Sequence, residues 1–266
     1  MNEKYNDVDL IKVANQLFKA KNESYAIEPV HAHIEQYAIS GAYKVQALQT
    51  KYYQDKGHRI IGRKIGLTAL AVQRQLGVGQ PDFGTLFDYM QLENGCELSM
   101  SKLIQPKIEA EIAFVLKKDL DKTNHSLEEI IEAIDYSLPA FEIVDSRIKD
   151  WKISILDTIS DNASSAYFVL GSGPQVLSYS ELSSIQMECF EDNVLVCSGT
   201  GQDCLGNPIN ALKWLADQMA KLGTPLKSKD IVLSGAIGKM IPVKTGSTYQ
   251  AQFTGFEKIS ITFVEG

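Results

Sequence analysis

The segment KIEAEIAFVL, residues 107–116, places two glutamates inside what its alternating pattern predicts to be a buried β-strand. One face of this strand carries only apolar side chains, those of Ile108, Ala110, Ile112 and Phe114. The other face carries Glu109 and Glu111 together with Ala113 and Val115. A solvated strand face is the common explanation for such a pair of acids. The apolar residues that continue the glutamate face favour burial on both sides instead.

A third acid among apolar neighbours is Glu142 in PAFEIVDS, residues 139–146, where it shares a predicted strand face with Ala140 and Val144. Burying a carboxylate without a partner is costly, so three such acids are more easily explained if they converge on a cation. Carboxylates without neighbouring histidines or thiolates suit a hard ion, Mg²⁺ or Mn²⁺. Alternation defines local faces only. The convergence of Glu142 on Glu109 and Glu111 is therefore a hypothesis.

Two further candidates come from glycine-containing segments. The predicted strand GRKIGL, residues 62–67, places Gly62, Lys64 and Gly66 on one face, and glycines there allow a ligand to approach closely. The alternative is an ordinary surface lysine on an edge strand. Asp82 in QPDFG is a second candidate, although an aspartate after proline also favours a turn for local hydrogen-bonding reasons.

The segment DTISDNASS, residues 157–165, supplies polar side chains just before an apolar strand. Serine, asparagine and aspartate often serve turns and helix caps, and we expect most of these residues to do so. A hydroxyl of Ser164 or Ser165 is the candidate to bind a substrate carboxylate.

The predicted elements divide the chain into a helical N-terminal portion, residues 1–57, and a strand-rich body, residues 58–266, which together form one structural unit. The first helix begins at Asp7 or Asp9, and the second ends near Gly57. In the body we expect a hairpin that turns at Asp192 and Asn193, and short strands from Asp230 onward. Further predicted elements are a strand at 59–67, helices at 69–78, 126–135 and 207–223, and a turn at 79–84.

Composition narrows the class of protein. With 266 residues, 44% of them hydrophobic and 22% charged, the chain is long enough to bury a sizeable core. Its four cysteines form no CxxC pair, and we expect free thiols. The net charge of −7 argues against a nucleic-acid partner. The sequence lacks an apolar segment long enough for a signal peptide or a membrane span, so we expect a cytoplasmic protein.

Taken together, several ordered motifs closely resemble the 2-oxo-4-pentenoate hydratases, which belong to the hydratase and decarboxylase family of the fumarylacetoacetate hydrolase superfamily. The motifs are GRKIGLT at 62–68, LGVGQPDFGTLF at 76–87, IQPKIEAEIAFVL at 104–116, PAFEIVDSRIKDW at 139–151 and DTISDNASSAYFVLG at 157–171. The resemblance implies an α+β fold, a mixed β-sandwich roll with flanking helices. It also implies a homo-oligomer such as a pentamer or decamer.

The resemblance assigns a role to each candidate residue. The metal ligands of the family match Glu109, Glu111 and Glu142, and its metal is Mg²⁺ or Mn²⁺. The active-site lysine and aspartate map onto Lys64 and Asp82, and the polar substrate contact falls on Ser164 or Ser165.

The implied reaction is hydration of 2-hydroxypenta-2,4-dienoate to 4-hydroxy-2-oxopentanoate in the meta-cleavage degradation of aromatic compounds. Alternatives within the fold are 2-oxo-3-hexenedioate (4-oxalocrotonate) decarboxylase, 2-oxohept-4-ene-1,7-dioate hydratase and hydrolysis of an acylpyruvate. A dicarboxylate substrate favours an additional positively charged side chain in the pocket. The candidates for it are Arg59, Arg63, Arg74 and Arg147. A non-catalytic partner that associates with neighbouring pathway enzymes is a further alternative, disfavoured because all five catalytic and metal-ligand candidates are present.

Overall fold

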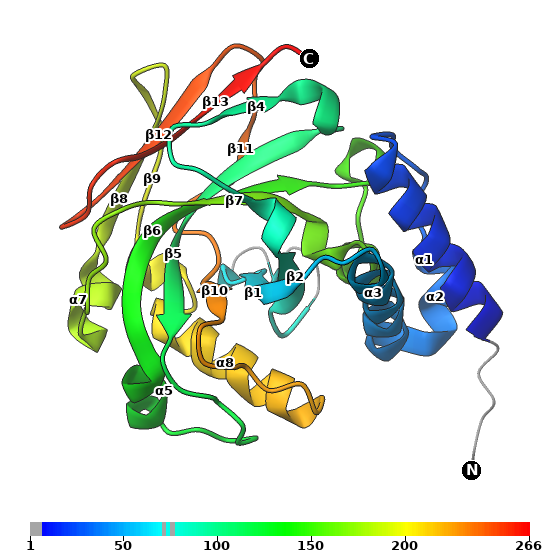
Figure 1. Ribbon diagram of the computed structural model, residues 1–266, viewed down its shortest axis with the longest axis horizontal. Helices are drawn as coiled ribbons and strands as arrows, with labels where there is room; N and C mark the ends of the chain where they lie inside the picture. The colour runs from blue at the N-terminus through cyan, green and yellow to red at the C-terminus, as the bar shows by residue number, and fades with distance from the viewer. Residues whose placement is uncertain (1–6, 71–72, 75–77) are drawn as a thin grey trace.

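The helical N-terminal portion packs against one side of a β-rich body (Figure 1). The computed structural model describes residues 7–70, 73–74 and 78–266. The N-terminal helices are α1 (Asp7–Asn22), α2 (His31–Ile34) and α3 (Ala38–Asp55), with a 3₁₀ turn, η1 (Glu35–Tyr37), before α3. Leu10, Ala14 and Leu17 of α1 are buried together with Val45 of α3, as helical spacing predicts. The division of the chain at residue 58 into two parts stays a prediction.

The larger sheet is mixed and has the strand order β2-β1-β10-β5-β6-β7-β3, with β11 paired to β5. Its centre is the long antiparallel pair β5 and β6, whereas β1 runs parallel to β10 and β3 parallel to β7. The strands are β1 (Ile60–Gly66), β2 (Asp82–Phe87), β3 (Gln91–Leu92), β5 (Pro106–Leu116), β6 (Ile134–Asp145), β7 (Ser165–Leu170), β10 (Ile231–Leu233) and β11 (Ile241–Pro242).

The smaller sheet has the order β4-β13-β12-β8-β9. Its strands are β4 (Glu97–Ser99), β8 (Gln186–Glu191), β9 (Val194–Thr200), β12 (Thr248–Phe253) and β13 (Ile259–Val264). The predicted hairpin is confirmed, because Asp192 and Asn193 join β8 to β9 with φ angles of 48° and 68°. Both residues thus take the left-handed conformation that a tight hairpin turn requires.

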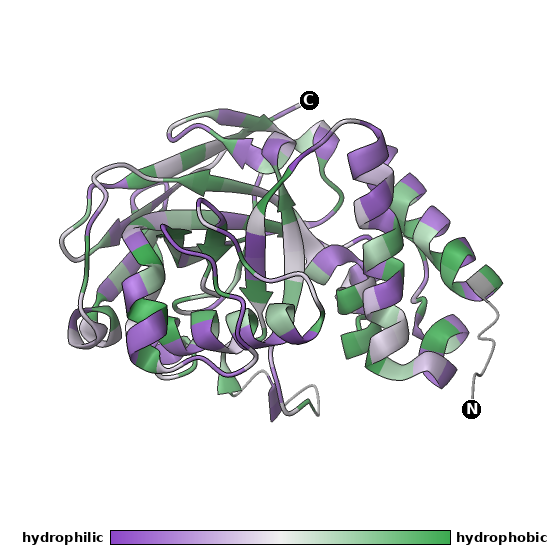
Figure 2. Ribbon diagram, turned by 60° about the horizontal axis from the view of Figure 1, so that its bottom comes forward, coloured by the Kyte–Doolittle hydropathy of each residue, from purple (hydrophilic) through white to green (hydrophobic). Residues whose placement is uncertain are grey.

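The β-rich body also contains helices and 3₁₀ turns. They are α5 (Leu127–Ala133), α6 (Ile155–Ser160), α7 (Tyr179–Ser184) and α8 (Pro208–Lys221), with 3₁₀ turns η2 (Asp88–Met90), η3 (Met100–Lys102), η4 (Lys149–Trp151), η5 (Asn162–Ser164) and η6 (Gly201–Asp203). The Asn207 side chain accepts a hydrogen bond from the Ile209 N–H at the start of α8, and Gly223 beyond its end has φ +75°. In Figure 2 the helices and the strands both carry hydrophobic and hydrophilic residues.

The main hydrophobic core lies between the two sheets and includes Ile112 and Phe141 from the larger sheet and Phe253 and Phe263 from the smaller one. A second core on the opposite face of the larger sheet includes Ala113 and other buried residues of β6, β7 and β10. Both faces of β5 are therefore covered by protein. Within the described residues, no helix is long and apolar enough to span a bilayer.

Three predictions about local structure need comment. The predicted turn at 79–84 is wrong at Asp82, because β2 begins there and pairs with β1. The predicted helix at 126–135 has the expected capping box of Ser126 and Glu129 but ends at Ala133, since β6 begins at Ile134. In the helix predicted at 69–78, residues 70, 73 and 74 are helical, whereas 71–72 and 75–77 lie outside the described residues.

Candidate active site

The three glutamates predicted as metal ligands lie together on the two central strands. Glu109 of β5 is paired directly with Glu142 of β6, and Glu111 lies two residues further along the same face of β5. One carboxylate oxygen from each residue lies within 4.8 Å of those from the other two. Glu111 and Glu142 are fully buried and Glu109 is partly buried. The alternative of a solvated strand face is wrong.

The cluster contains more carboxylate oxygens than protein donors. The Gly235 N–H donates to Glu111 Oε2 over 2.7 Å, whereas Glu111 Oε1 and Glu142 Oε1 lack a hydrogen-bond partner among the residues described. Burial raises the pKa of Glu109 to about 7, although the ammonium of Lys64 lowers it. Burial and the neighbouring carboxylates raise the pKa of Glu111 well above its ordinary value. Both shifts have the sign expected for acids crowded together away from water.

Lys64 brings a positive charge to this cluster from β1. Its side chain is 3% exposed, and its Nζ lies 3.0 Å from Glu142 Oε2 and donates to the Ala163 carbonyl over 3.1 Å. Burial disfavours the charged ammonium, but the carboxylates of Glu142 and Glu109 outweigh this effect and raise the pKa of Lys64. The surface-lysine alternative is therefore wrong, because β1 lies inside the sheet between β2 and β10.

The two glycines that flank Lys64 make room for protein atoms. A Cβ on Gly62 would lie 1.9 Å from the Ile231 carbonyl oxygen, so its space is filled by β10, and the expected close approach of a ligand there is wrong. A Cβ on Gly66 would lie 2.2 Å from Asp82 Oδ1. Gly66 therefore admits the Asp82 carboxylate to the site.

Asp82 is held at the start of β2, opposite Gly66 in the register of β1 and β2. Its side chain is 1% exposed, and Oδ2 accepts a hydrogen bond from the Thr158 hydroxyl over 3.4 Å. Its Oδ1 has no hydrogen-bond partner in the part of the chain that the structure describes. Burial raises the pKa of Asp82, and the nearby Lys64 ammonium lowers it in part. The side chain is thus a buried acid beside a cation rather than a local turn group.

Ser164 and Ser165 lie where η5 passes into β7, and both are buried. Neither hydroxyl has a hydrogen-bond partner among the described residues. Other polar residues of this segment have structural partners. Asp157 forms the capping box of α6 with Ser154, as predicted for a helix cap, and also accepts hydrogen bonds from the Val30 and His31 backbone. Asn162 pairs with the backbone of Thr85 on β2, a tertiary contact rather than the expected local one. The two serines therefore keep hydroxyls available for a ligand.

Comparison with known proteins decides the family. The sequence profile described as fumarylacetoacetate (FAA) hydrolase C-terminal matches residues 77–264. The chain belongs to the fumarylacetoacetate hydrolase family. Both the family resemblance and the expected α+β fold are thereby confirmed.

Relatives within the family are similar over almost their whole length. The chain is 44% identical over 259 residues to a 2-keto-4-pentenoate hydratase of Burkholderia vietnamiensis, covering 97% of this chain and 99% of the relative. It is 45% identical over 253 residues to a 2-keto-4-pentenoate hydratase of Paraburkholderia phymatum, covering 95% and 97% of the two chains. These relatives confirm the prediction of an enzyme of the hydro-lyase class.

A solved structure of a related protein has nearly the same fold. The 4-oxalocrotonate decarboxylase of Pseudomonas putida G7, complexed with magnesium and adipate, superposes with a TM-score of 0.93. It is 30% identical, and the match covers 99% of this chain and all of the decarboxylase. This chain therefore resembles proteins with two different named activities, a hydratase in sequence and a decarboxylase in structure.

Several residues of this family member were missed or misjudged from sequence. Thr158 contacts Asp82 and Gly235 contacts Glu111, and neither contact was predicted from the sequence. Arg147 was a candidate for binding a distal substrate carboxylate, but its guanidinium is 2% exposed and pairs with Asp161. Its positive charge is therefore paired with a carboxylate of the protein itself. The four cysteines are free thiols, as predicted.

Proposed function

We propose that this protein hydrates 2-hydroxypenta-2,4-dienoate, the dienol form of 2-oxopent-4-enoate, to 4-hydroxy-2-oxopentanoate. The observation that carries the proposal is the buried cluster of Glu109, Glu111 and Glu142 with Lys64 beside it, in a chain 44% identical to a 2-keto-4-pentenoate hydratase. The reaction adds one water and needs proton transfers at carbon together with stabilisation of charge on the C2 oxygen. The side chains of the site offer groups for both tasks.

A divalent cation, Mg²⁺ or Mn²⁺, fits the donor set of the three glutamates. Their oxygens lie within 4.8 Å of one another, and two of these buried oxygens lack protein partners among the described residues. Carboxylate oxygens are the ligands that hard divalent ions prefer. The related decarboxylase is itself complexed with magnesium. When bound, such an ion would supply positive charge that holds a 2-oxo acid and draws electrons toward C2.

We assign Lys64 to the oxygen at C2. Its raised pKa keeps the ammonium charged, which suits a hydrogen-bond donor and disfavours a general base. Negative charge develops on the C2 oxygen when water adds to C4 of the conjugated enone. A charged donor already fixed by Glu142 and the Ala163 carbonyl stabilises that charge with little reorganisation.

We assign Asp82 to proton transfer and to orientation of the water. Protonation at C5 converts the dienol to the enone, water then adds to C4, and C3 takes the last proton. Burial raises the pKa of Asp82, so its carboxyl group exchanges a proton nearer to neutral pH than an ordinary aspartate does. A positioned acid or base of this kind contributes roughly 10²–10⁴-fold in rate. The hydroxyls of Ser164 and Ser165 are assigned to the substrate carboxylate.

The main rival is decarboxylation of 2-oxo-3-hexenedioate, favoured by the TM-score of 0.93 to the 4-oxalocrotonate decarboxylase. Sequence identity favours the hydratase, at 44% against 30%. Hydration of the dicarboxylate 2-oxohept-4-ene-1,7-dioate is less favoured, because two of the candidate cations for a second carboxylate are engaged elsewhere. Arg147 pairs with Asp161, and Arg59 is exposed and pairs with Asp88.

Assembly is a separate part of the proposal. The family resemblance implies a homo-oligomer, a pentamer or a decamer, and association with neighbouring pathway enzymes. Light scattering on the purified protein measures the number of subunits. Co-purification with the decarboxylase of the same pathway tests the association with neighbouring enzymes.

A comparison of three substrates tests the proposed function. Metal-loaded protein is given 2-hydroxypenta-2,4-dienoate, 2-oxo-3-hexenedioate and 2-oxohept-4-ene-1,7-dioate in separate reactions, with absorbance and product mass recorded. The proposal expects the highest kcat/KM for the pentadienoate and a product heavier by one water. Release of CO₂ from 2-oxo-3-hexenedioate without turnover of the pentadienoate would assign the decarboxylase activity instead.

A further inference from the structure

A left-handed turn supports the lysine end of the site. Asn162, Ala163 and Ser164 have φ angles of 55°, 50° and 56°, and none of them is glycine. Three consecutive residues in this region are unfavourable for L-amino acids, most of all for alanine and serine. Such a conformation persists only where the surrounding structure holds it. The conformation of this turn therefore depends on the contacts that neighbouring residues make with it.

The turn presents two kinds of group to the site. The Ala163 carbonyl accepts the hydrogen bond from Lys64 Nζ, and the buried hydroxyls of Ser164 and Ser165 follow immediately. A change in the backbone at residues 162–164 thus moves the acceptor that orients the Lys64 ammonium. The same change moves the serine hydroxyls.

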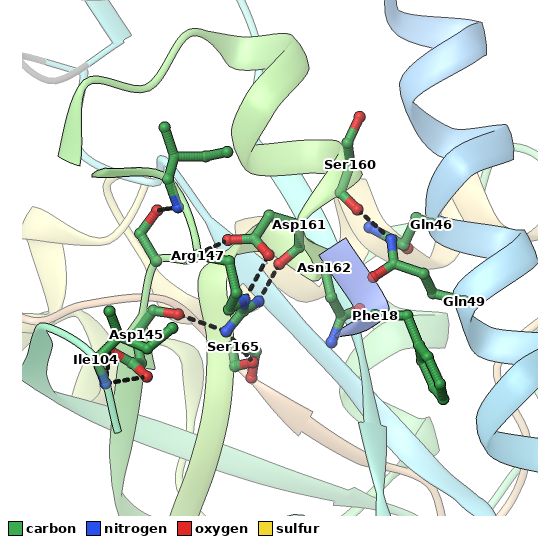
Figure 3. A network of polar contacts seen from close by, with 12 residues as sticks. Phe18, Gln46, Gln49, Ile104, Asp145, Arg147, Ser160, Asp161, Asn162 and Ser165 are labelled. Atoms are coloured by element: carbon green, nitrogen blue, oxygen red, sulfur yellow. Dashed lines mark hydrogen bonds and ion pairs between the residues drawn. The ribbon is translucent and has the colours of Figure 1, made fainter. Parts of the chain in front are cut away.

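Arg147 holds this turn from the β6 side (Figure 3). Its Nε donates to Asp161 Oδ1, its Nη2 donates to the Asp161 carbonyl, and the Arg147 backbone N–H donates to Asp161 Oδ2. Its Nη1 donates to the Asp145 carbonyl and, over 3.4 Å, to the Ser165 carbonyl. One buried guanidinium therefore binds carbonyls at both ends of the turn and one at the end of β6.

The opposite side of the turn is held by β2. Asn162 Oδ1 accepts from the Thr85 N–H over 2.7 Å, and Asn162 Nδ2 donates to the Thr85 carbonyl over 2.9 Å. Gly84 permits this approach, because a Cβ there would lie 2.5 Å from the Asn162 carbonyl oxygen. The turn is thus fixed between two strands of the larger sheet.

We propose that Arg147 is a positioning residue, which acts through Asp161 and the turn at 162–164 to hold the Ala163 carbonyl where it orients the Lys64 ammonium. This inference rests on the proposed function for its effect on turnover. It differs from a role in substrate binding, since the guanidinium makes its contacts to the protein itself. The planar fork of arginine binds several acceptors at once, which a lysine ammonium at the same position does not reproduce.

The test compares Arg147→Lys with the same change in an Ala163→Gly background. Glycine adopts a positive φ without strain, so the turn then depends less on the guanidinium. Arg147→Lys alone is expected to lower kcat by about 10²-fold with a small change in KM, as a misplaced catalytic group does. In the Ala163→Gly background the loss is expected to shrink to a few-fold. Arg59→Lys, at an exposed ion pair, controls for the change of residue type.

Rescue in the glycine background separates positioning from a merely structural role. If Arg147 acts through the turn, the loss in Arg147→Lys falls on kcat and shrinks when residue 163 is glycine. An equal loss of kcat in both backgrounds, or a loss that comes mainly from a raised KM, would overturn the inference.

Amide hydrogen exchange provides a readout that needs no turnover. Arg147→Lys should accelerate exchange in peptides covering 158–168 while peptides of β12 and β13 keep their protection. If the unaltered protein fails to hydrate the pentadienoate but this local change occurs, the proposed function is wrong, whereas the role of Arg147 in holding the turn at 162–164 is supported. If exchange at 158–168 is unchanged in Arg147→Lys and the unaltered protein hydrates the pentadienoate normally, only the positioning role of Arg147 is contradicted. If Arg147→Lys does not fold, Asp161→Asn weakens the same contacts with little change of shape and should produce the same local exchange.

Discussion

Glu109 and Glu142 lie directly opposite each other on the antiparallel strands β5 and β6. Side chains in such a pair have Cβ atoms about 4.5–5.5 Å apart, and like charges at that spacing destabilise a sheet. Glu111 adds a third carboxylate on the same face, and Lys64 supplies one positive charge. When all three carboxylates are ionised, the cluster has excess negative charge that a divalent cation would neutralise.

Neutralising one carboxylate should weaken cation binding. Glu109→Gln and Glu142→Gln each keep the shape of the side chain and remove one anionic ligand. We expect the affinity for Mn²⁺, measured by calorimetry, to fall by about 10²-fold or more, because ligand charge strongly tunes such sites. Glu188→Gln is the matched control, since Glu188 is an exposed glutamate on β8. Equal affinities for all three variants would rule out the glutamate cluster as the cation site.

Cation binding should depend on pH below neutrality. Burial raises the pKa of Glu109 to about 7, so at lower pH its carboxyl group holds a proton that must leave before a cation binds. The affinity should therefore rise as the pH approaches about 7. Calorimetry in two buffers of different ionisation enthalpy counts the protons released. Glu109→Gln should release fewer protons; an affinity that does not change across this range contradicts the expectation.

Replacing Lys64 should slow turnover. Lys64→Met keeps an extended side chain but removes the charge that faces Glu142 and that we assign to the C2 oxygen of the substrate. We expect kcat to fall by about 10²–10⁴-fold, the range for a group that acts on protons or developing charge. Lys118→Met removes an exposed lysine paired with Glu132 and serves as the control. Steady-state kinetics on the pentadienoate measure both, and similar rates for the two variants would remove Lys64 from the mechanism.

Adding a single methyl group at Gly66 should displace Asp82. A Cβ there would lie 2.2 Å from Asp82 Oδ1, so Gly66→Ala forces the carboxylate or the strand to move. We expect a large loss of kcat while Mn²⁺ affinity stays within a few-fold of the original, because Asp82 is not one of the three clustered ligands. Gly79→Ala adds the same methyl where, beyond its chain neighbours, no atom of the described residues lies within 4 Å. A Gly66→Ala protein with normal kcat would show that Asp82 needs no fixed position.

Local sequence patterns predicted the acids of the site but not their geometry. Alternation alone places Glu109 and Glu111 on one face of β5, since the period of a strand is two. The pairing of Glu109 with Glu142 depends on the register of two strands separated by a helix and loops, and that register follows from tertiary packing. The convergence of the three acids was accordingly no more than a hypothesis from sequence.

Local patterns also misled where tertiary contacts prevailed. Proline and glycine around Asp82 favour a turn, yet pairing with β1 makes the segment a strand. Gly62 suggested open space for a ligand, but the backbone of Ile231 fills it. The sequence around Arg147 does not distinguish a substrate contact from an ion pair within the protein, because Asp161 lies next to Arg147 only in the folded chain.

The most direct test of the account is metal-dependent hydration of 2-hydroxypenta-2,4-dienoate in water enriched in ¹⁸O. Metal-stripped protein is assayed before and after addition of Mg²⁺, with dienol absorbance and product mass followed in the same sample and Glu142→Gln in parallel. The account predicts that Mg²⁺ restores turnover of the unaltered protein and that 4-hydroxy-2-oxopentanoate carries ¹⁸O at C4. Full turnover by the metal-stripped protein, or none after Mg²⁺ or Mn²⁺ is added, would contradict it.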